Sequence, residues 1–143
     1  MIEKEVWLKG SATLTIGDNT LIGRRNLIGC NEKITIGKNC LLGENVRIQD
    51  TDHRFEDISI PIRSQGITTA PIEIGDNVWI GYGSVVTKGV TIGEGSVIGA
   101  NSVVTRDIPP FSIAAGVPAR VIRYRNQTCE KETDLNSELL TSV

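Results

Sequence analysis

An aliphatic residue followed by glycine recurs every six residues along most of the chain. The pairs are Ile16-Gly17, Ile22-Gly23, Ile28-Gly29, Ile36-Gly37, Leu42-Gly43, Ile74-Gly75, Ile80-Gly81, Ile92-Gly93 and Ile98-Gly99. The fourth residue after each aliphatic is usually small or β-branched, as in Thr20, Cys40, Val78 and Ser96. An α-helix repeats about every 3.6 residues and a coiled coil about every 3.5, so neither keeps these pairs in register. The pattern favours short strands joined by tight turns.

Three such strands would form one triangular coil, with one aliphatic side chain per strand pointing inward. A single coil cannot bury its own apolar face, so successive coils would stack and form continuous aliphatic columns. We expect about four to five coils, four of them over 16–33, 36–53, 74–91 and 92–109, with 6–15 as a partial cap. Glycine is expected to take the turn conformations that other residues resist. The predicted fold is therefore an all-β stack of parallel strands.

The six-residue period fails between Ile48 and Ile74. The segment 54–71 reads as a long excursion loop, because Pro61, Gly66 and Pro71 interrupt any regular element there. A loop of that length in a small domain is usually either functional or disordered. It begins directly after His53, the single histidine of the chain.

His53 ends the predicted strand before the loop, so its side chain should project outward at a corner of the prism. Imidazole near neutrality suits removal of a proton from a hydroxyl or an amine. Asp50 and Asp52 lie close enough in sequence to orient it. The period places Asp52 at an inward position and leaves Asp50 as a polar strand residue.

Composition excludes several classes of function. The formal charge of −2 gives no electrostatic reason to expect a nucleic-acid or membrane-surface partner. No stretch approaches the roughly 20 apolar residues of a membrane span, and the first residues lack a signal-peptide layout, so we expect a cytoplasmic protein. Three cysteines without metal-ligand spacing and one histidine argue against a zinc site. We expect one domain over 1–125 and a polar tail over 126–143.

The second half of the chain carries the most specific motifs. They are Ile74-Gly75-Asp76-Asn77-Val78-Trp79-Ile80-Gly81, Val104-Thr105-Arg106-Asp107-Ile108-Pro109-Pro110 and Ala114-Ala115-Gly116-Val117-Pro118-Ala119-Arg120-Val121-Ile122-Arg123. With these motifs, residues 16–125 resemble the hexapeptide-repeat acyltransferases, in particular the sugar O-acetyltransferases of the galactoside and maltose type and those of polysaccharide biosynthesis. The resemblance implies a left-handed parallel β-helix.

The resemblance also implies a homotrimer with active sites in the grooves between chains and acetyl-CoA as co-substrate. Carried over by position, the backbone of Tyr82 and Ala100 would bind the pantetheine amides. The side chains near the nucleotide and its phosphates would be Thr105, Arg106, Arg120 and Arg123. Residues 80–125 hold five basic residues against two acidic ones, which suits phosphate binding. No metal is expected.

Acceptor residues are less specific in the sequence. Trp79 would form a flat wall beside the sugar and the thioester, and Asn26 is a candidate contact one coil before His53. The excursion loop would carry acceptor specificity, with Arg63 facing an acidic group. The shortness of the region before the repeats, compared with galactoside and maltose acetyltransferases, shifts the expectation toward enzymes that act on surface-polysaccharide precursors.

The expected reaction is direct transfer of acetyl from acetyl-CoA to a sugar hydroxyl, with His53 as general base. Backbone N–H groups near Gly81 and Gly83 are expected to stabilise the oxyanion. Two alternatives stay open. One is a xenobiotic acetyltransferase that inactivates an antibiotic, and the other is a non-catalytic ligand-binding β-helix.

Overall fold

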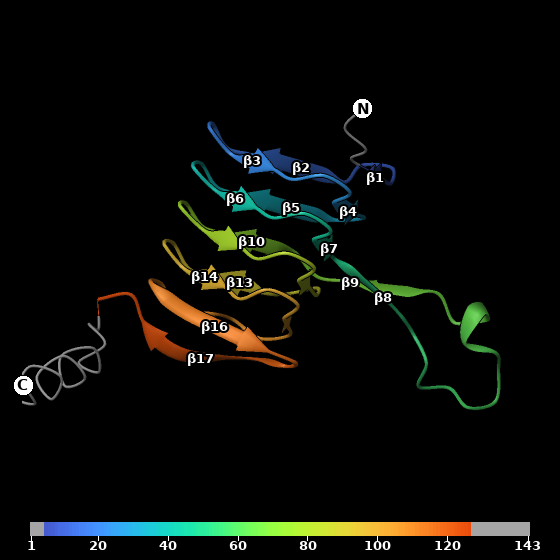
Figure 1. The fold of residues 1–143 in the computed structure, drawn as a ribbon. Helices are drawn as coiled ribbons and strands as arrows, with labels where there is room; N and C mark the ends of the chain where they lie inside the picture. Colours follow the sequence, from blue (N-terminus) through green and yellow to red (C-terminus); the bar gives the residue numbers. More distant parts are fainter. Residues whose placement is uncertain (1–4, 127–143) are drawn as a thin grey trace, which may run out of the picture.

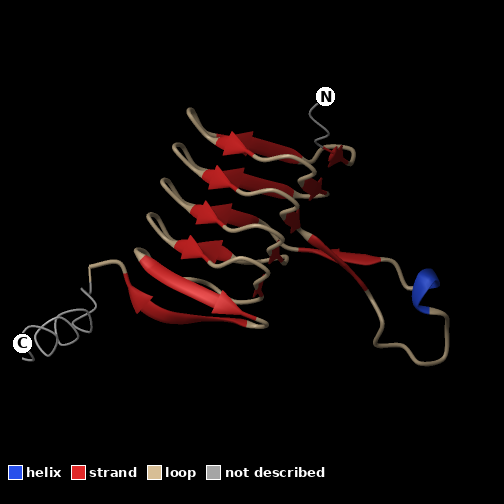
Figure 2. Ribbon diagram, viewed as in Figure 1, coloured by secondary structure: helices blue, strands red, loops and turns tan. Residues whose placement is uncertain are grey.

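The computed structural model describes residues 5–126 and shows a three-sided prism of short strands from which a two-stranded arm projects (Figure 1). No α-helix occurs among the described residues, and the single helical element is one 3-10 turn at the end of the arm (Figure 2). The predicted tail lies outside the described residues except for Asn126. Within residues 5–126, no helix is long and apolar enough to cross a membrane.

Each side of the prism is one sheet of strands stacked in parallel. Face A contains β1 (Glu5–Leu8), β4 (Leu27–Cys30), β7 (Arg47–Gln49), β12 (Val85–Val86) and β15 (Val103–Val104). Face B contains β2 (Thr13–Ile16), β5 (Lys33–Ile36), β10 (Ile72–Ile74) and β13 (Thr91–Ile92). Face C contains β3 (Leu21–Ile22), β6 (Leu41–Leu42), β11 (Trp79–Ile80), β14 (Val97–Ile98), β16 (Ser112–Gly116) and β17 (Ala119–Tyr124).

The six-residue period produces one aliphatic column inside each face. The column behind face A is Val6, Ile28, Ile48, Val86 and Val104. The column behind face B is Ile16, Ile36, Ile74 and Ile92, and the one behind face C is Ile22, Leu42, Ile80, Ile98 and Ala114. Most of these side chains are fully buried, which confirms the predicted core.

The two ends of the prism extend further than the sequence indicated. The segment expected as a partial cap contributes two sides of a first coil, β1 and β2. After residue 109 the chain adds β16 to face C, and β17 then pairs with β16 antiparallel. This hairpin occupies the last edge of the face, opposite β3 (Figure 1).

The repeat glycines are required for a different reason than predicted. None of those that follow an aliphatic residue has a positive φ. In the turns the left-handed conformation is taken by other residues, among them the asparagines Asn19, Asn39, Asn45, Asn77 and Asn101 and the glycines Gly83, Gly89 and Gly95. The glycines lie where the next coil passes very close. A Cβ on Gly81 would stand 2.6 Å from the backbone nitrogen of Ala100. The glycine period therefore reflects coil-to-coil contact.

The predicted excursion loop is present, but it is neither structureless nor confined to 54–71. β8 (Thr51–His53) leaves the prism and pairs antiparallel with β9 (Ile67–Thr69), so a ribbon carries the loop outward, with η1 (Ile62–Ser64) near its tip. At the neck, the N–H of Ala70 donates to the carbonyl of Asp50, and the N–H of Gly89 donates to the carbonyl of Ala70. The ladder between coils thus continues across the insertion.

Asp50 anchors this neck, and the inward and outward assignment made from the period is wrong. Its side chain is fully buried, whereas that of Asp52 is exposed. One carboxylate oxygen of Asp50 accepts the N–H of Asn31 at 2.8 Å, and the other accepts those of Glu32 and Lys33 at 2.8 and 3.0 Å. Burial alone would raise the pKa of Asp50, but these donors outweigh it and hold the pKa below its usual value.

Replacing Asp50 by Asn should destabilise the fold by about 2–4 kcal/mol, because an amide offers one acceptor atom to a turn that presents three N–H donors. The folded pKa of Asp50 is below its unfolded value of about 3.9, so its contribution is present above that pH and is lost as the pH falls through the folded pKa. The stability gap between wild type and Asp50→Asn should therefore narrow below about pH 4.

Denaturant unfolding across pH measures this gap at one fixed protein concentration. Asp52→Asn is the matched control, since its exposed carboxylate lies 3.7 Å from the Lys88 ammonium and should contribute under about 1 kcal/mol. Equal effects of the two substitutions would contradict the anchoring role of Asp50.

Adding a methyl group at Gly81 should lower the stability by about 1–3 kcal/mol, because the atoms it meets belong to the backbone of the next coil. Gly29→Ala is the control: its Cβ would meet the Gln49 side chain at an ordinary 3.5 Å. Thermal unfolding of the two variants should show a clear decrease for Gly81→Ala and little change for Gly29→Ala. A similar decrease in both would exclude coil-to-coil contact as the cause.

Candidate active site

His53 stands at the end of β8, on the ribbon just outside the corner between faces A and B. The prediction that it projects outward is confirmed, since its side chain is exposed, but the residue lies on the arm and not on the prism itself. A cavity of about 220 Å³ lies beside it. The lining residues are Arg47, Gln49, Thr51, Asp52, His53, Val85, Val86 and Thr87. His53 therefore lies beside β7 and β12 of face A.

One ammonium group braces the arm against the prism, in addition to the backbone hydrogen bonds at the neck. Lys88 Nζ donates to Thr68 Oγ1 on β9 at 2.6 Å and lies 3.7 Å from Asp52 Oδ2 on β8. Asp52 and His53 are consecutive in a strand, so their side chains point to opposite sides of the ribbon. Among the described residues neither Asp50 nor Asp52 hydrogen-bonds to His53. The two carboxylates hold the neck and the ribbon, which in turn place the imidazole.

The three predicted acceptor residues are not brought together within one chain. Trp79 is half exposed at the start of β11 on face C, as expected for a wall residue. Arg63 is exposed in η1 near the tip of the arm. Asn26 is 2% exposed, and its Oδ1 accepts the N–H of Val46 at 2.7 Å. Its Nδ2 has no hydrogen-bond partner among the described residues, and the residue lines a small cavity with Glu5, Arg25 and Leu27.

Tyr82 and Ala100 occupy the same turn of successive coils, at the corner between faces C and A. The N–H of Asn101 donates to the carbonyl of Tyr82 at 2.7 Å. The backbone N–H groups of Tyr82 and Ala100 and the carbonyl of Ala100 have no partner among the described residues. The ladder between coils leaves these groups without partners, and an extended ligand that carries amides can pair with them.

Two of the backbone N–H groups in the turn predicted to stabilise an oxyanion are already used by the fold. The N–H of Gly81 donates to the carbonyl of Ile98, and that of Gly83 donates to the carbonyl of Glu44. The N–H of Tyr82, between them, has no partner among the described residues, so oxyanion stabilisation near these glycines stays a prediction that rests on Tyr82.

The residues predicted to lie near the nucleotide and its phosphates divide between one corner of the prism and the face opposite that corner. Thr105 and Arg106 follow β15 at the corner between faces A and B, the same corner as His53. Arg120 and Arg123 are exposed on β17, in face C with Trp79. Face C is the side of the three-sided prism that lies opposite the corner between faces A and B. One chain therefore presents two half-sites, which are not in contact.

Sequence reasoning missed the polar pair beside His53. The Arg47 guanidinium donates twice to Gln49 Oε1, at 3.1 and 2.7 Å, and this pair forms the floor of the His53 cavity. The signal was present: Arg47 and Gln49 flank the inward Ile48 and must point outward. Within residues 5–126, no cluster of three metal-ligating side chains occurs.

Comparisons with known proteins agree with the prism. Residues 71–106 match the family described as bacterial transferase hexapeptide (six repeats), and residues 33–48 match the hexapeptide repeat of succinyl-transferase. The chain is 42% identical over 132 residues to galactoside O-acetyltransferase of Escherichia coli (strain K12), which covers 87% of this chain and 64% of that protein. It thus spans less than two thirds of that relative's length.

Solved structures show the same likeness. A galactoside acetyltransferase in complex with coenzyme A aligns with a TM-score of 0.76 and 43% identity, over 85% of this chain and 60% of that one. A maltose O-acetyltransferase from Clostridium difficile 630 aligns with a TM-score of 0.72 and 37% identity, over 89% of this chain and 68% of that one. With this fold and these repeats, the chain belongs to the hexapeptide-repeat acetyltransferase family.

Proposed function

We propose that this protein is an acetyl-CoA-dependent O-acetyltransferase that transfers acetyl directly to a hydroxyl of a sugar-containing acceptor, with His53 as general base. The observation that carries the proposal is the placement of the single imidazole on a braced ribbon beside an open cavity. A histidine in a mobile loop, without a fixed position, would not need the hydrogen bond and the ion pair of Lys88 that brace this ribbon. Its chemistry matches removal of a hydroxyl proton near neutral pH.

The separation of the half-sites supports a homotrimer. His53 lies beyond face A, whereas Trp79, Tyr82 and Ala100 lie on face C and its far corner, so a complete site requires the face A side of one chain and face C of another. Face C also carries an exposed apolar row, Leu21, Leu41 and Trp79, in register along the prism. Flat faces of this kind suit cyclic association of identical prisms.

Coenzyme A fits the corner of Tyr82 and Ala100. Its pantetheine arm carries two amides, and this corner offers backbone N–H and carbonyl groups that the ladder does not use. Thr105 and Arg106 on one edge, and Arg120 and Arg123 on the other, would hold the nucleotide and its phosphates. Guanidinium groups are suited to phosphate because they offer paired donors.

Transfer from a thioester needs little further activation. His53 would take the proton as the acceptor hydroxyl attacks the acetyl carbonyl, the C–S bond would break, and the thiolate of CoA would leave. The proton would then pass from the imidazole to the departing sulfur, so that the histidine is regenerated. The Trp79 ring would exclude water from one side of the acceptor and so limit hydrolysis of the thioester.

The acceptor class follows from the arm and from the cavity beside His53. Both are open to solvent, so an acceptor attached to a larger molecule can reach the imidazole, which suits a surface-polysaccharide precursor. Arg63 near the tip of the arm would meet an acidic group of such an acceptor. An antibiotic as acceptor is the alternative, and an acceptor screen separates the two.

Replacing His53 by Ala should lower the rate of acceptor-dependent CoA release by about 10²–10⁴-fold without changing acetyl-CoA binding. The measurement is thiol release with acetyl-CoA against sugars, nucleotide sugars and hydroxylated amines, paired with calorimetric binding of CoA. Glu73→Ala, an exposed change on face B, is the control and should leave both unchanged. CoA binding without any His53-dependent release would contradict the catalytic role, and absence of CoA binding would contradict the co-substrate.

Mixed oligomers test whether two chains build each site. His53→Ala and Trp79→Ala should each transfer little acetyl to the acceptor alone, since the first lacks the base and the second loses acetyl to water. Equal amounts refolded together should regain about a quarter of wild-type transfer activity, because some interfaces then pair an intact His53 with an intact Trp79. Mixing without refolding is the control. A site formed within one chain would regain no activity, and that result would exclude the trimeric arrangement.

A further inference from the structure

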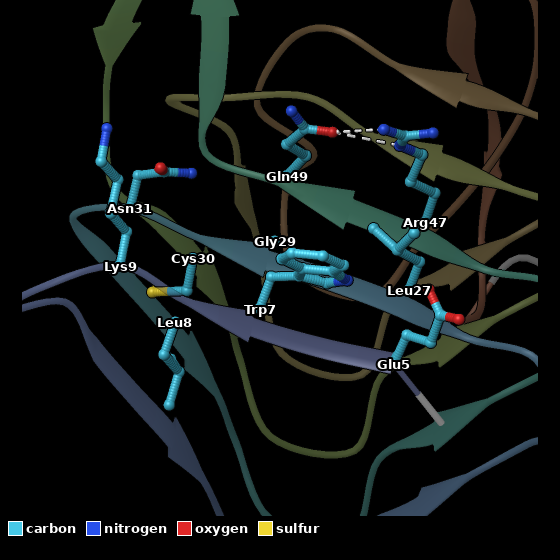
Figure 3. A pocket seen from close by; sticks show the side chains of 10 residues that line it. All are labelled: Glu5, Trp7, Leu8, Lys9, Leu27, Gly29, Cys30, Asn31, Arg47 and Gln49. Atoms are coloured by element: carbon cyan, nitrogen blue, oxygen red, sulfur yellow. Dashed lines mark hydrogen bonds between the residues drawn. The ribbon is translucent and has the colours of Figure 1, made fainter. Parts of the chain in front are cut away.

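A second cavity lies on face A, next to the His53 cavity and toward β1. It has a volume of about 480 Å³ and opens to solvent between the first three strands of the face (Figure 3). Its lining residues are Glu5, Trp7, Leu8, Lys9, Leu27, Gly29, Cys30, Asn31, Arg47 and Gln49. Three of these, Trp7, Gly29 and Gln49, are direct register partners on neighbouring strands.

The missing side chain of Gly29 leaves a notch between the Trp7 ring and the Gln49 side chain, here called the Trp7 notch. Trp7 is 68% exposed although it lies on a strand of the prism. A Cβ built on Gly29 would meet only the Gln49 side chain within 4 Å, so Trp7 does not cover the notch. The indole therefore stands as an open wall on one side of it, with Gln49 on the other (Figure 3).

The polar groups around the notch are planar hydrogen-bonding groups. Arg47 holds Gln49 through two hydrogen bonds to its Oε1, which leaves the Gln49 amide nitrogen free to donate to a ligand. The Arg47 guanidinium forms no salt bridge among the described residues. Asn31 and Glu5 add an amide and a carboxylate at the two ends. An aromatic wall beside fixed amide, guanidinium and carboxylate groups suits a pyranose ring, which has an apolar face and a polar rim.

This cavity adjoins the His53 cavity, because Arg47 and Gln49 line both. Trp7 and Gln49 are separated by two strand spacings of about 4.8 Å. The cavity beside His53 is lined by residues of β7 and β12, on the side of Gln49 away from Trp7. Trp7 and His53 are therefore more than about 10 Å apart, which is further than one pyranose ring can span. A ligand in contact with both must contain more than one sugar unit.

We propose that the Trp7 notch is a sugar-binding subsite, and that the acceptor is an oligosaccharide whose reacting unit lies at His53 while a distal unit stacks on Trp7. This inference rests on the proposed function for the reacting end, but the subsite itself binds glycan without acetyl-CoA. Arg47 and Gln49 would contact the units in between. Gly29 is a specificity residue, because its missing side chain provides the space for the distal ring.

Tryptophan fluorescence tests the subsite directly, because the chain has only two tryptophans. In the Trp79→Phe protein, Trp7 is the sole reporter. Maltotriose, a galactose trimer and a hexuronic acid trimer are titrated without acetyl-CoA, with the three monosaccharides as controls. At least one trimer should change the Trp7 emission saturably at millimolar concentration, and its monosaccharide should bind at least about tenfold more weakly.

Two further substitutions in that background identify the notch. Gly29→Leu fills it, and Arg47→Ala removes the group that holds Gln49, so each should weaken trimer binding by about tenfold or more. Thr35→Leu, an outward change on face B, should have no effect. If none of the three trimers changes the Trp7 signal, or if Gly29→Leu and Arg47→Ala both bind like the parent protein, the subsite does not exist.

Two outcomes separate this inference from the proposed function. His53→Ala should abolish turnover and leave the Trp7 titration intact, so a failure of catalysis does not decide the subsite. Trp7→Ala should raise the KM for the trimer about tenfold, with kcat and the KM for the monosaccharide unchanged. If Trp7→Ala instead dissociates the oligomer, as shown by light scattering, the notch is an interface between copies and the proposal is overturned.

Discussion

Backbone hydrogen bonds between successive coils are the constraint on which the rest of the structure depends. They hold the coils about 4.8 Å apart, so every side chain must fit beside the equivalent side chains of the neighbouring coils at that spacing. Inside the prism, this spacing brings aliphatic side chains at equivalent positions of successive coils into contact and so forms the three buried columns. At the corners, it leaves no room for a Cβ beneath the next coil, as at Gly81. Outside, it lines up whatever the sequence places at outward positions, such as Leu21, Leu41 and Trp79.

Much of the fold was predictable because one side of the prism takes six residues, so the period in the sequence is also the period in space. The arm was predictable only as an interruption. Thr51–His53 and Ile67–Thr69 are too short and too polar to show strand alternation, so their pairing could not be found from the sequence. The faces of Asp50 and Asp52 were misassigned for a related reason: the chain turns out of the prism between them, and a one-residue change of register exchanges the two faces of a strand.

The candidate site was predictable in its residue types but not in its layout. His53 stood out as the single histidine beside a break, and the motifs from Trp79 to Arg123 indicated the family. The distribution of these residues over two edges of the prism depends on how many residues each side takes, which the motifs do not show. The Trp7 notch is formed by three strands that are far apart in sequence. Gly29 gave no signal of it, because glycine is common throughout the repeat.

Two hydrogen bonds at Ala70 close the prism beneath the arm, and Asp50 binds the turn above it. The insertion therefore leaves and re-enters the prism through a neck that is complete without it. Lengthening a loop at such a neck costs little, since closure entropy grows only with the logarithm of loop length. The arm is thus a replaceable module: evolution or an engineer can exchange its tip, between Arg54 and Gly66, while the prism, the neck and the imidazole stay where they are.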